Sequence, residues 1–171
     1  MTRKTRKKIP PRTEAEVLAA NRHMCCICHN EGRSVQIHHI DDDPSNNDPE
    51  NLCVVCLPHH DMITGEPGLG KGFTKKELGI YKKEWEDRCK VEDTKKIVIE
   101  NFNLFVEQEP SLKDKIPLSD MVTDIASMAT LDGVVQSVEA SANQVYTSTG
   151  DESLAKTFKV FVLKHRDKNP E

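Results

Sequence analysis

The 171-residue chain contains no run of 18 consecutive apolar residues, so the sequence offers no membrane-spanning helix. Its first ten residues include basic side chains and no acid, but no apolar stretch follows them, and a cleaved secretory signal is not expected. Hydrophobic residues make up only 36% of the chain and charged residues 30%, which allows a small core and argues against full disorder. We therefore expect a cytoplasmic protein without a membrane partner, built as one domain or as a small domain with a helical extension.

Cysteine and histidine, by contrast, are concentrated in one segment. Eleven of the thirteen Cys and His residues lie between His23 and His60, about a fifth of the chain. Disulfides are rare inside cells, so six cysteines in such a chain favour metal binding or free thiols. The distribution predicts a metal site in the N-terminal half.

Two pairs of residues have the spacing of zinc ligands. Cys25 and Cys28 form a Cys-x-x-Cys pair, and Cys56 and His59 form a Cys-x-x-His pair. Two intervening residues allow a turn to direct both side chains at one ion, and four such ligands make a closed, structural zinc site. Cys53 and Cys56 are also spaced as Cys-x-x-Cys, so spacing alone leaves open a four-cysteine site that would free His59.

A second group of polar residues lies between and just after these pairs. His38 and His39 end a predicted strand over residues 34–40, Asn51 follows, and His60 comes directly after the second pair. Hydrolysis of a phosphodiester at neutral pH needs a base to activate water and a cation to offset negative charge. One histidine of the adjacent pair could bind a metal ion while the other remains free as a base. Neighbouring strand residues point to opposite faces, so both can serve one site only at a bend or a strand end.

The remaining elements are predicted from caps and periodicity. A flexible basic arm is expected over residues 1–12, followed by a short helix over 13–22 that Thr13 and Glu16 would cap as a capping box. The second Cys/His pair is expected to open a helix ending near residue 64, and Thr74 to cap a longer helix. Residues 97–106 are ambiguous between helix and strand. Apolar spacing predicts a helix over 118–145 that is interrupted at 132–133, and a last helix over 153–165. The apolar stripe of the first of these helices would form either a core or an interface between copies of the chain.

The ordered series of motifs resembles the HNH endonuclease family, the ββα-metal nucleases whose active site is held by zinc. The resemblance covers residues 9–88 and rests on Cys25-Cys-Ile-Cys28, Gln36-Ile-His-His-Ile40, Asn51-Leu52 and Cys56-Leu-Pro-His-His60. It implies an α+β protein with a zinc-stapled nuclease module over residues 13–95 and a mostly helical region over 96–171. It also implies double-stranded DNA as the substrate, and restriction or phage defence are among the processes that use such modules.

The resemblance assigns a role to each residue of the second group. His39 matches the general base, and Asn51 matches the middle asparagine that braces the loop and orients this base. His38 and His60 match the positions that bind a catalytic Mg²⁺, Mn²⁺ or Ni²⁺ ion. Cys56 lies five residues after Asn51, and this register favours structural zinc on Cys25, Cys28, Cys56 and His59, although the family more often has cysteine at the last of these positions.

Two other functions remain open at this point. The first is a non-catalytic zinc module that binds nucleic acid, which would have no use for His38, His39, Asn51 and His60 in register. The second is an interaction protein that works through its C-terminal helices. Six basic side chains without an acid among residues 1–12 are expected to contact the DNA backbone, although they could also form a solubilising tail.

Overall fold

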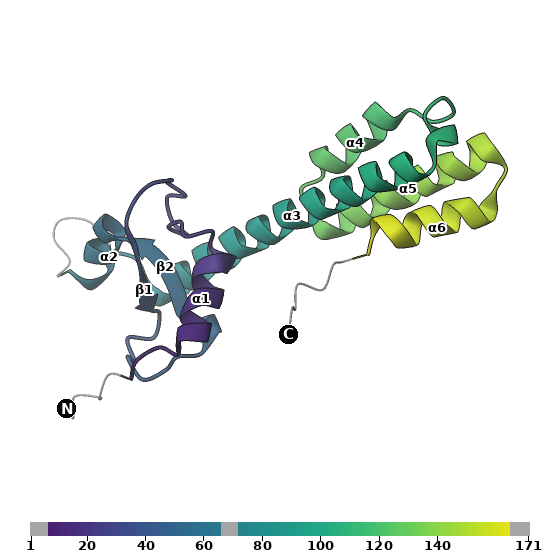
Figure 1. The fold of residues 1–171 in the computed structure, drawn as a ribbon. Coiled ribbons are helices and arrows are strands. Elements are labelled where there is room, and N and C mark those ends of the chain that lie inside the picture. Colours follow the sequence, from purple (N-terminus) through teal and green to yellow (C-terminus); the bar gives the residue numbers. More distant parts are fainter. Residues whose placement is uncertain (1–6, 66–71, 165–171) are drawn as a thin grey trace. The chain divides into compact units, whose positions relative to one another are not determined.

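The computed structural model describes residues 7–65 and 72–164, and the chain divides into two compact units, Met1–Lys90 and Val91–Glu171 (Figure 1). Helix α3 (Lys75–Gln108) begins in the first unit and ends in the second. The rest of each unit is described by itself below. None of the described helices is long and apolar enough to cross a membrane.

The first unit has the α+β composition that the sequence predicts. Helix α1 (Pro11–Ala20) precedes strand β1 (Val35–His39), and a short 3₁₀ turn, η1 (Pro49–Asn51), leads into strand β2 (Leu52–Cys56) and helix α2 (Leu57–Thr64). The two strands pair antiparallel, with Val35 opposite Cys56 and His39 opposite Leu52. The order strand, strand, helix follows directly from these elements.

Strand β2 is buried on both faces, which explains why the alternation rule did not reveal it. Leu52 and Val54 pack with Val17 of α1 on one side. Cys53 and Val55 belong to a second cluster that includes Trp85 and Cys89 of α3. The sequence analysis named no strand here, but the helix that the second Cys/His pair was expected to open is confirmed, since α2 begins directly after Cys56 and ends at Thr64.

The start of α1 corrects one prediction. The helix begins at Pro11, and Thr13 does not cap it, because no side chain makes a capping hydrogen bond there. Proline at the first helical position already has the required φ and lacks an N–H to satisfy. Glu16, the expected capping-box partner, instead pairs with Arg12 one turn away at 2.8 Å. Pro11 and Arg12 therefore belong to the helix, and residues 1–6 of the predicted arm lie outside the described part of the chain.

The predicted start of α3 is confirmed. Thr74 Oγ1 accepts a hydrogen bond from the backbone N–H of Glu77, and a Glu77 carboxylate oxygen accepts one from the backbone N–H of Thr74. This reciprocal pair is a capping box. The helix then continues through residues 97–106, the segment that was ambiguous from the sequence.

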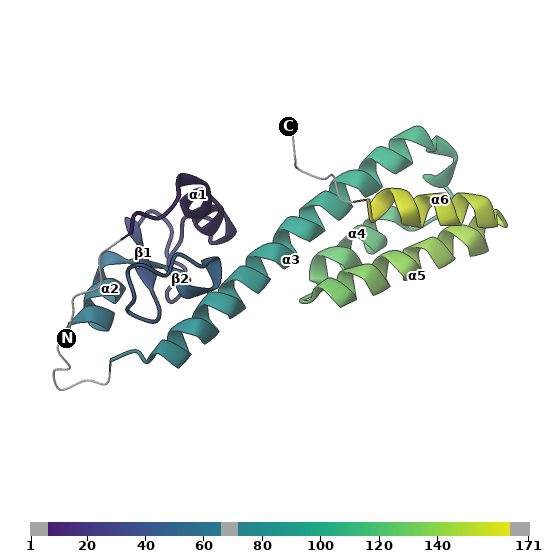
Figure 2. The same ribbon diagram turned by 90° about the horizontal axis from the view of Figure 1, so that it is seen from below.

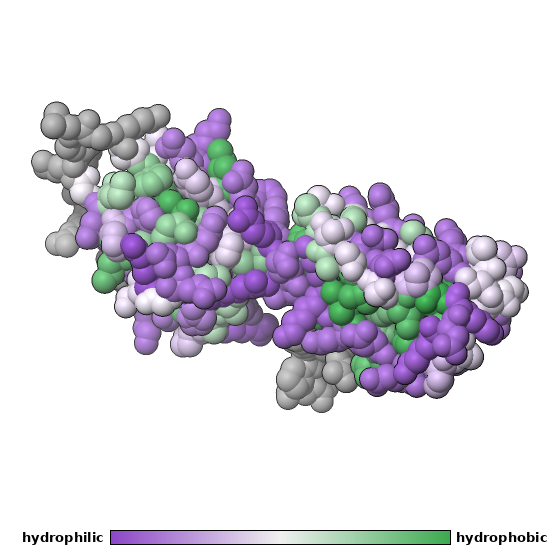
Figure 3. All heavy atoms as spheres, turned by 90° about the horizontal axis from the view of Figure 1, so that it is seen from above, coloured by the Kyte–Doolittle hydropathy of each residue, from purple (hydrophilic) through white to green (hydrophobic). Residues whose placement is uncertain are grey.

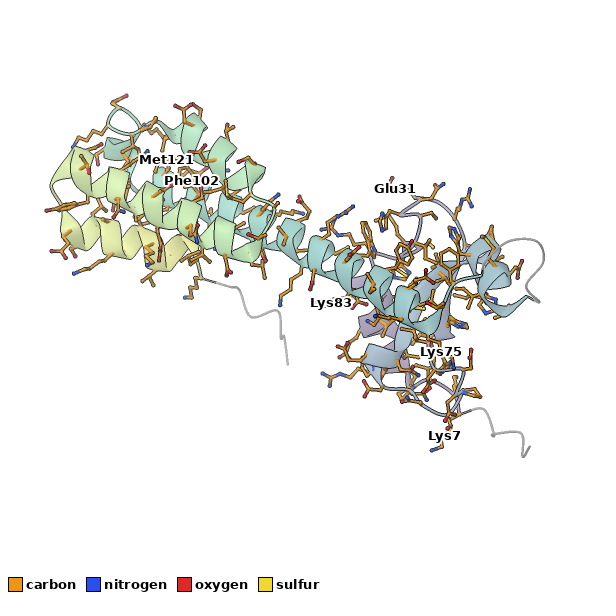
Figure 4. All side chains as sticks on the ribbon, turned by 180° about the vertical axis from the view of Figure 1, so that it is seen from behind. Lys7, Glu31, Lys75, Lys83, Phe102 and Met121 are labelled. Carbon is orange, nitrogen blue, oxygen red and sulfur yellow. The ribbon has the colours of Figure 1, made fainter. Side chains whose placement is uncertain are left out.

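The second unit is a helical bundle around one apolar core. After η2 (Pro110–Leu112) it contains α4 (Leu118–Ser127), α5 (Leu131–Thr149) and α6 (Glu152–Val162), which pack against the last turns of α3 (Figure 2). Phe158 of α6 stacks edge-on against Phe102 and Phe105 of α3. Figure 4 labels Phe102 and Met121, both buried in this core. On the face drawn in Figure 3, hydrophobic side chains of this unit gather between hydrophilic ones.

The apolar stripe predicted over residues 118–145 serves the core of its own unit, since its members at 121, 125, 138, 142 and 145 are buried there. Val135, also predicted to belong to the stripe, is exposed, and its neighbour Val134 is buried in the core in its place. The interruption falls earlier than predicted. Met128 is extended, and α5 restarts after Thr130, whose hydroxyl accepts a hydrogen bond from the N–H of Gly133. Gly133 therefore lies inside the first turn of α5. A Cβ at this position would meet the side chains of Met128 and Thr130 at 3.1 Å, so the capped turn leaves little room there.

Candidate metal centre and active site

Four side chains converge in the first unit. The ligand atoms of Cys25, Cys28, Cys56 and His59 all lie within 4.8 Å of one another. His59 Nδ1 is 3.4 Å from Cys25 Sγ and 3.2 Å from Cys56 Sγ, and the Sγ atoms of Cys28 and Cys56 are 4.0 Å apart. A tetrahedral zinc ion with Zn–S of about 2.3 Å needs ligand atoms about 3.5–3.8 Å apart. The cluster therefore fits the ion in donor chemistry and in size, and it could hold zinc.

Two local structures deliver these ligands. Cys25 and Cys28 lie in the turn after α1, which the backbone N–H of Cys26 ties to the carbonyl of Val54 in β2 at 2.9 Å. Cys56 is the last residue of β2 and the N-cap of α2, so His59 stands in the first turn of that helix. The cluster thus joins the turn to the point where strand becomes helix.

Cys53 lies outside this cluster. Its thiol points to the carbonyl of His38 at 3.6 Å, and Cys25, Cys28, Cys56 and His59 are the only such group of ligand atoms in the described part of the chain. In an extended strand three residues span about 10 Å, so Cys53 and Cys56 do not meet at one ion as they would in a turn. The structure thus brings together the four favoured ligands and separates the alternative one.

Burial and neighbouring groups shift the pKa values of three of the four candidate ligands. Burial lowers the pKa of His59 and the neighbouring Arg33 lowers it further, so the imidazole is neutral at pH 7, as metal binding requires. Burial raises the pKa of Cys25 to about 11. Burial also opposes ionisation of Cys56, but hydrogen bonds from the His59 backbone and the Cys25 and Cys28 thiols outweigh it and lower the pKa of Cys56. Of Cys25 and Cys56, Cys56 is therefore the thiol that ionises more readily.

A cavity of about 270 Å³ lies beside this cluster, and three of the predicted active-site histidines line it. His38, His39 and His60 share this lining with Ile37, Asp42 and Pro44. The rings of His38 and His60 meet edge-on, with centroids 5.4 Å apart. His39 is the last residue of β1, so the strand end gives both neighbours access to one cavity, as the sequence required.

His38 is the most unusual of the three. It is only 7% exposed, and its Nε2 atom is buried without a hydrogen-bond partner among the described residues. Burial lowers the pKa of His38, and the charge of nearby His60 lowers it further, against the opposing effect of Asp42. A neutral imidazole with a free buried nitrogen is the form that binds a metal ion. The chemistry of His38 therefore suits a ligand to a divalent ion.

A comparison with known families identifies this segment. Residues 32–61 match the family model described as HNH endonuclease. The predicted resemblance to the HNH endonucleases is confirmed. The matched HNH segment contains β1, the following loop, β2 and the first turns of α2, and so it includes every residue of the cavity. No curated protein and no solved structure matches the chain.

Asn51, predicted from the resemblance to be the middle asparagine of the motif, makes three hydrogen bonds to the loop after β1. Its side-chain amide donates to Asp41 Oδ1 at 2.9 Å and to the carbonyl of Asn46 at 3.0 Å. Its Oδ1 accepts from the backbone N–H of Asp41 at 3.0 Å. These three bonds hold the loop at Asp41 and at Asn46. None of the described hydrogen bonds of Asn51 reaches His39.

The partner of His39 is a residue that sequence analysis missed. His39 Nε2 lies 3.1 Å from Asn47 Oδ1. The loop contains two adjacent asparagines and several other turn formers, so nothing in the spacing distinguished Asn47 from its neighbours. Only the closing of the loop brings it beside the histidine.

One lysine also reaches the site. Lys75, the first residue of α3, forms an ion pair with Asp42 at 2.7 Å and donates to the carbonyl of Asp41 at 2.7 Å. Both side chains of the ion pair remain more than half exposed. A positive charge therefore lies beside Asp42, at the edge of the cavity that the three histidines line.

Proposed function

We propose that this protein is a metal-dependent endonuclease that hydrolyses DNA phosphodiester bonds. The observation that carries the proposal is the buried, unpartnered Nε2 atom of His38, edge-on to His60, in a cavity that His39 also lines. Leaving a buried polar atom unsatisfied costs about 1–3 kcal/mol, and such atoms in folded proteins usually have a role. The match to the HNH endonucleases over these residues supports the same conclusion.

In this proposal His38 and His60 hold one catalytic divalent ion, Mg²⁺, Mn²⁺ or Ni²⁺. When bound, such an ion supplies positive charge against the developing charge of the phosphate. His39 is the general base that removes a proton from the attacking water. It is half-buried at the cavity wall, which leaves its ring accessible to that water. Asn51 acts indirectly, by keeping the loop closed around the site.

Zinc on Cys25, Cys28, Cys56 and His59 has a separate, structural role in the proposal. The cluster ties the turn after α1 to the junction of β2 and α2, and that junction also carries His60. A closed site with four protein ligands contributes folding energy and leaves no position for substrate. The zinc would therefore hold the cavity in shape without taking part in the reaction.

Double-stranded DNA is the proposed substrate, and basic side chains would hold its backbone. Lys7 and Lys75, both on the first unit in Figure 4, and Lys8 supply positive charge in the described part of the chain. Arg3, Lys4 and Arg6 add to it in sequence but lie outside the described residues. Contacts of this kind position the duplex without reading its sequence.

A plasmid assay tests the proposal. Supercoiled DNA is incubated with the full chain and Mg²⁺, Mn²⁺ or Ni²⁺, with and without chelator, and nicked and linear products are measured. We expect cleavage that the chelator abolishes. His38→Ala and His60→Ala should cut more slowly and need more metal, with partial rescue at high Mn²⁺. His23→Asn is the matched control, because His23 is exposed, does not line the cavity and has a positive φ that asparagine tolerates.

Two outcomes of this assay contradict the proposal. A chain that binds DNA but cuts nothing with any of the three ions is a non-catalytic zinc module. Cleavage that persists unchanged in both His38→Ala and His60→Ala means that the metal is held elsewhere.

A further inference from the structure

A continuous chain of hydrogen bonds links the N-terminal segment to the proposed base. The carbonyl of Lys8 accepts from Asn47 Nδ2 at 3.1 Å, and Asn47 Oδ1 lies 3.1 Å from His39 Nε2. Asn47 and His39 are both half-buried, so this contact is partly shielded from water. A single amide thus touches the arm on one side and the histidine on the other.

The chemistry of the groups fixes the direction of every bond in this chain. A backbone carbonyl can only accept, so the Asn47 atom that faces Lys8 is the amide nitrogen. The atom that faces His39 is then the amide oxygen, which also can only accept. His39 Nε2 must therefore carry a proton and donate it. In the neutral ring, the other nitrogen, Nδ1, is left with the free lone pair.

We propose that Asn47 is a positioning residue that holds His39 with Nδ1 free to take a proton from water. This inference rests on the proposed nuclease function and names the group that orients its base. A general base works only when its lone pair points at the proton it removes. Without Asn47 the ring could rotate about its side-chain bonds, and either nitrogen could carry the proton.

Asn47 is itself held from two sides. The backbone N–H of Lys7 donates to the carbonyl of Pro44 at 3.1 Å, so the arm follows the loop at two points, Pro44 and Asn47. Asn51 anchors the preceding residue, Asn46, through its carbonyl. The segment that ends at Asn47 is therefore held by the arm at Pro44 and by the Asn51 side chain at Asn46, which gives a positioning residue a fixed place. By the resemblance, Asn51 would orient the base itself. In this structure it contacts Asn46, the neighbour of Asn47, and so acts on His39 only through Asn47.

The competing explanation is that Asn47 only anchors the arm. Two substitutions separate these roles. Asn47→Asp keeps an acceptor for His39 Nε2–H but loses the donor to Lys8. Asn47→Leu has a similar size and loses both bonds.

Cleavage kinetics provide the first readout. We expect Asn47→Leu to lower kcat by about 10- to 100-fold with KM within about twofold, since misplacing a reacting group by about 1 Å can cost about a hundredfold. Asn47→Asp should keep kcat within about threefold of the wild type. If both variants lose kcat equally, the acceptor is not what matters and the inference is wrong.

Nuclear magnetic resonance provides a second readout that does not depend on cleavage. A hydrogen-bonded His39 Nε2–H should give a slowly exchanging proton signal, assigned by its absence in His39→Ala. We expect the signal in the wild type and in Asn47→Asp, and its loss in Asn47→Leu. If the signal persists in Asn47→Leu, Asn47 does not hold the ring and the inference fails. If the signals follow this pattern but the wild type cuts no DNA, the nuclease proposal fails and the positioning of His39 by Asn47 stands.

Discussion

The two units of this chain are held together by different means. In the second unit, one core cluster of fifteen buried residues, three of them phenylalanines, joins four helices. The first unit has two smaller clusters, and five of the seven buried residues in the larger one are cysteines. The unit with the poorer apolar core is also the one that contains the HNH segment and the four side chains that could hold a metal ion. Small cores commonly need such cross-links.

The two units also differ in what their side chains do: those of the second unit form a core, whereas those of the first include the candidate metal ligands and the candidate base. In the first unit, the histidines that line the cavity and the ligands of the cluster lie at strand ends, in a turn and at the start of a helix. In the second unit, the apolar residues of α4 and α5 are buried in the core of that unit. We therefore expect substitutions in the first unit to change zinc content, and substitutions in the core of the second unit to change stability alone.

Loss of the proposed zinc should have the largest effect. Structural zinc sites contribute about 10–16 kcal/mol of apparent binding free energy at pH 7. Cys56→Ser should release the ion and expose the amides of β1, β2 and α2 to hydrogen exchange, while α4, α5 and α6 remain protected. Zinc per chain by mass spectrometry and exchange resolved by segment are the measurements.

Cys53→Ser is the matched control for this experiment. Cys53 is as buried as Cys56 and lies in the same strand, but its thiol faces the His38 carbonyl. We expect it to keep one zinc ion per chain. The opposite pattern, with zinc lost in Cys53→Ser and kept in His59→Ala, would show that the four-cysteine register is correct.

Phe158→Ala should have the next largest effect, confined to the second unit. Phe158 is fully buried and contacts Phe102 and Phe105, and truncation of a buried phenylalanine costs about 3–5 kcal/mol. Chemical denaturation should show this loss, while zinc content and exchange protection of β1 and β2 stay unchanged. Loss of zinc in Phe158→Ala would mean that the two units do not fold separately.

These contrasts also explain which features the sequence could predict. The candidate zinc pairs and the Thr74 cap depend on residues three positions apart, so local spacing revealed them, although only the family resemblance favoured His59 over Cys53. Strand β2 was missed because it is buried on both faces and shows no alternation. Asn47 was missed because its partners, His39 and Lys8, are brought to it only by the folded loop. Local patterns identified the ligands, whereas contacts between distant segments needed the structure.

The basic arm should have the smallest effect. Deleting residues 1–6 removes three positive charges but leaves the Lys8 carbonyl that Asn47 binds. Each lost phosphate contact lowers the salt dependence of duplex binding by about 0.9, so the slope of log affinity against log salt should fall by at most about 2.7. Binding measured at several salt concentrations, on several DNA sequences, should weaken evenly. An unchanged slope would identify these residues as a tail.

We propose that the first unit contains a catalytic base, His39, that is separate from the zinc ion stabilising the fold of the unit. Cleavage of supercoiled plasmid by the wild type and by His39→Ala, in the same divalent ion and with zinc content measured on both, tests it most directly. Loss of a general base costs about 10²–10⁴ in rate, so His39→Ala should cut that much more slowly with one zinc ion per chain and unchanged DNA affinity. Equal cleavage rates for the two proteins would contradict the claim.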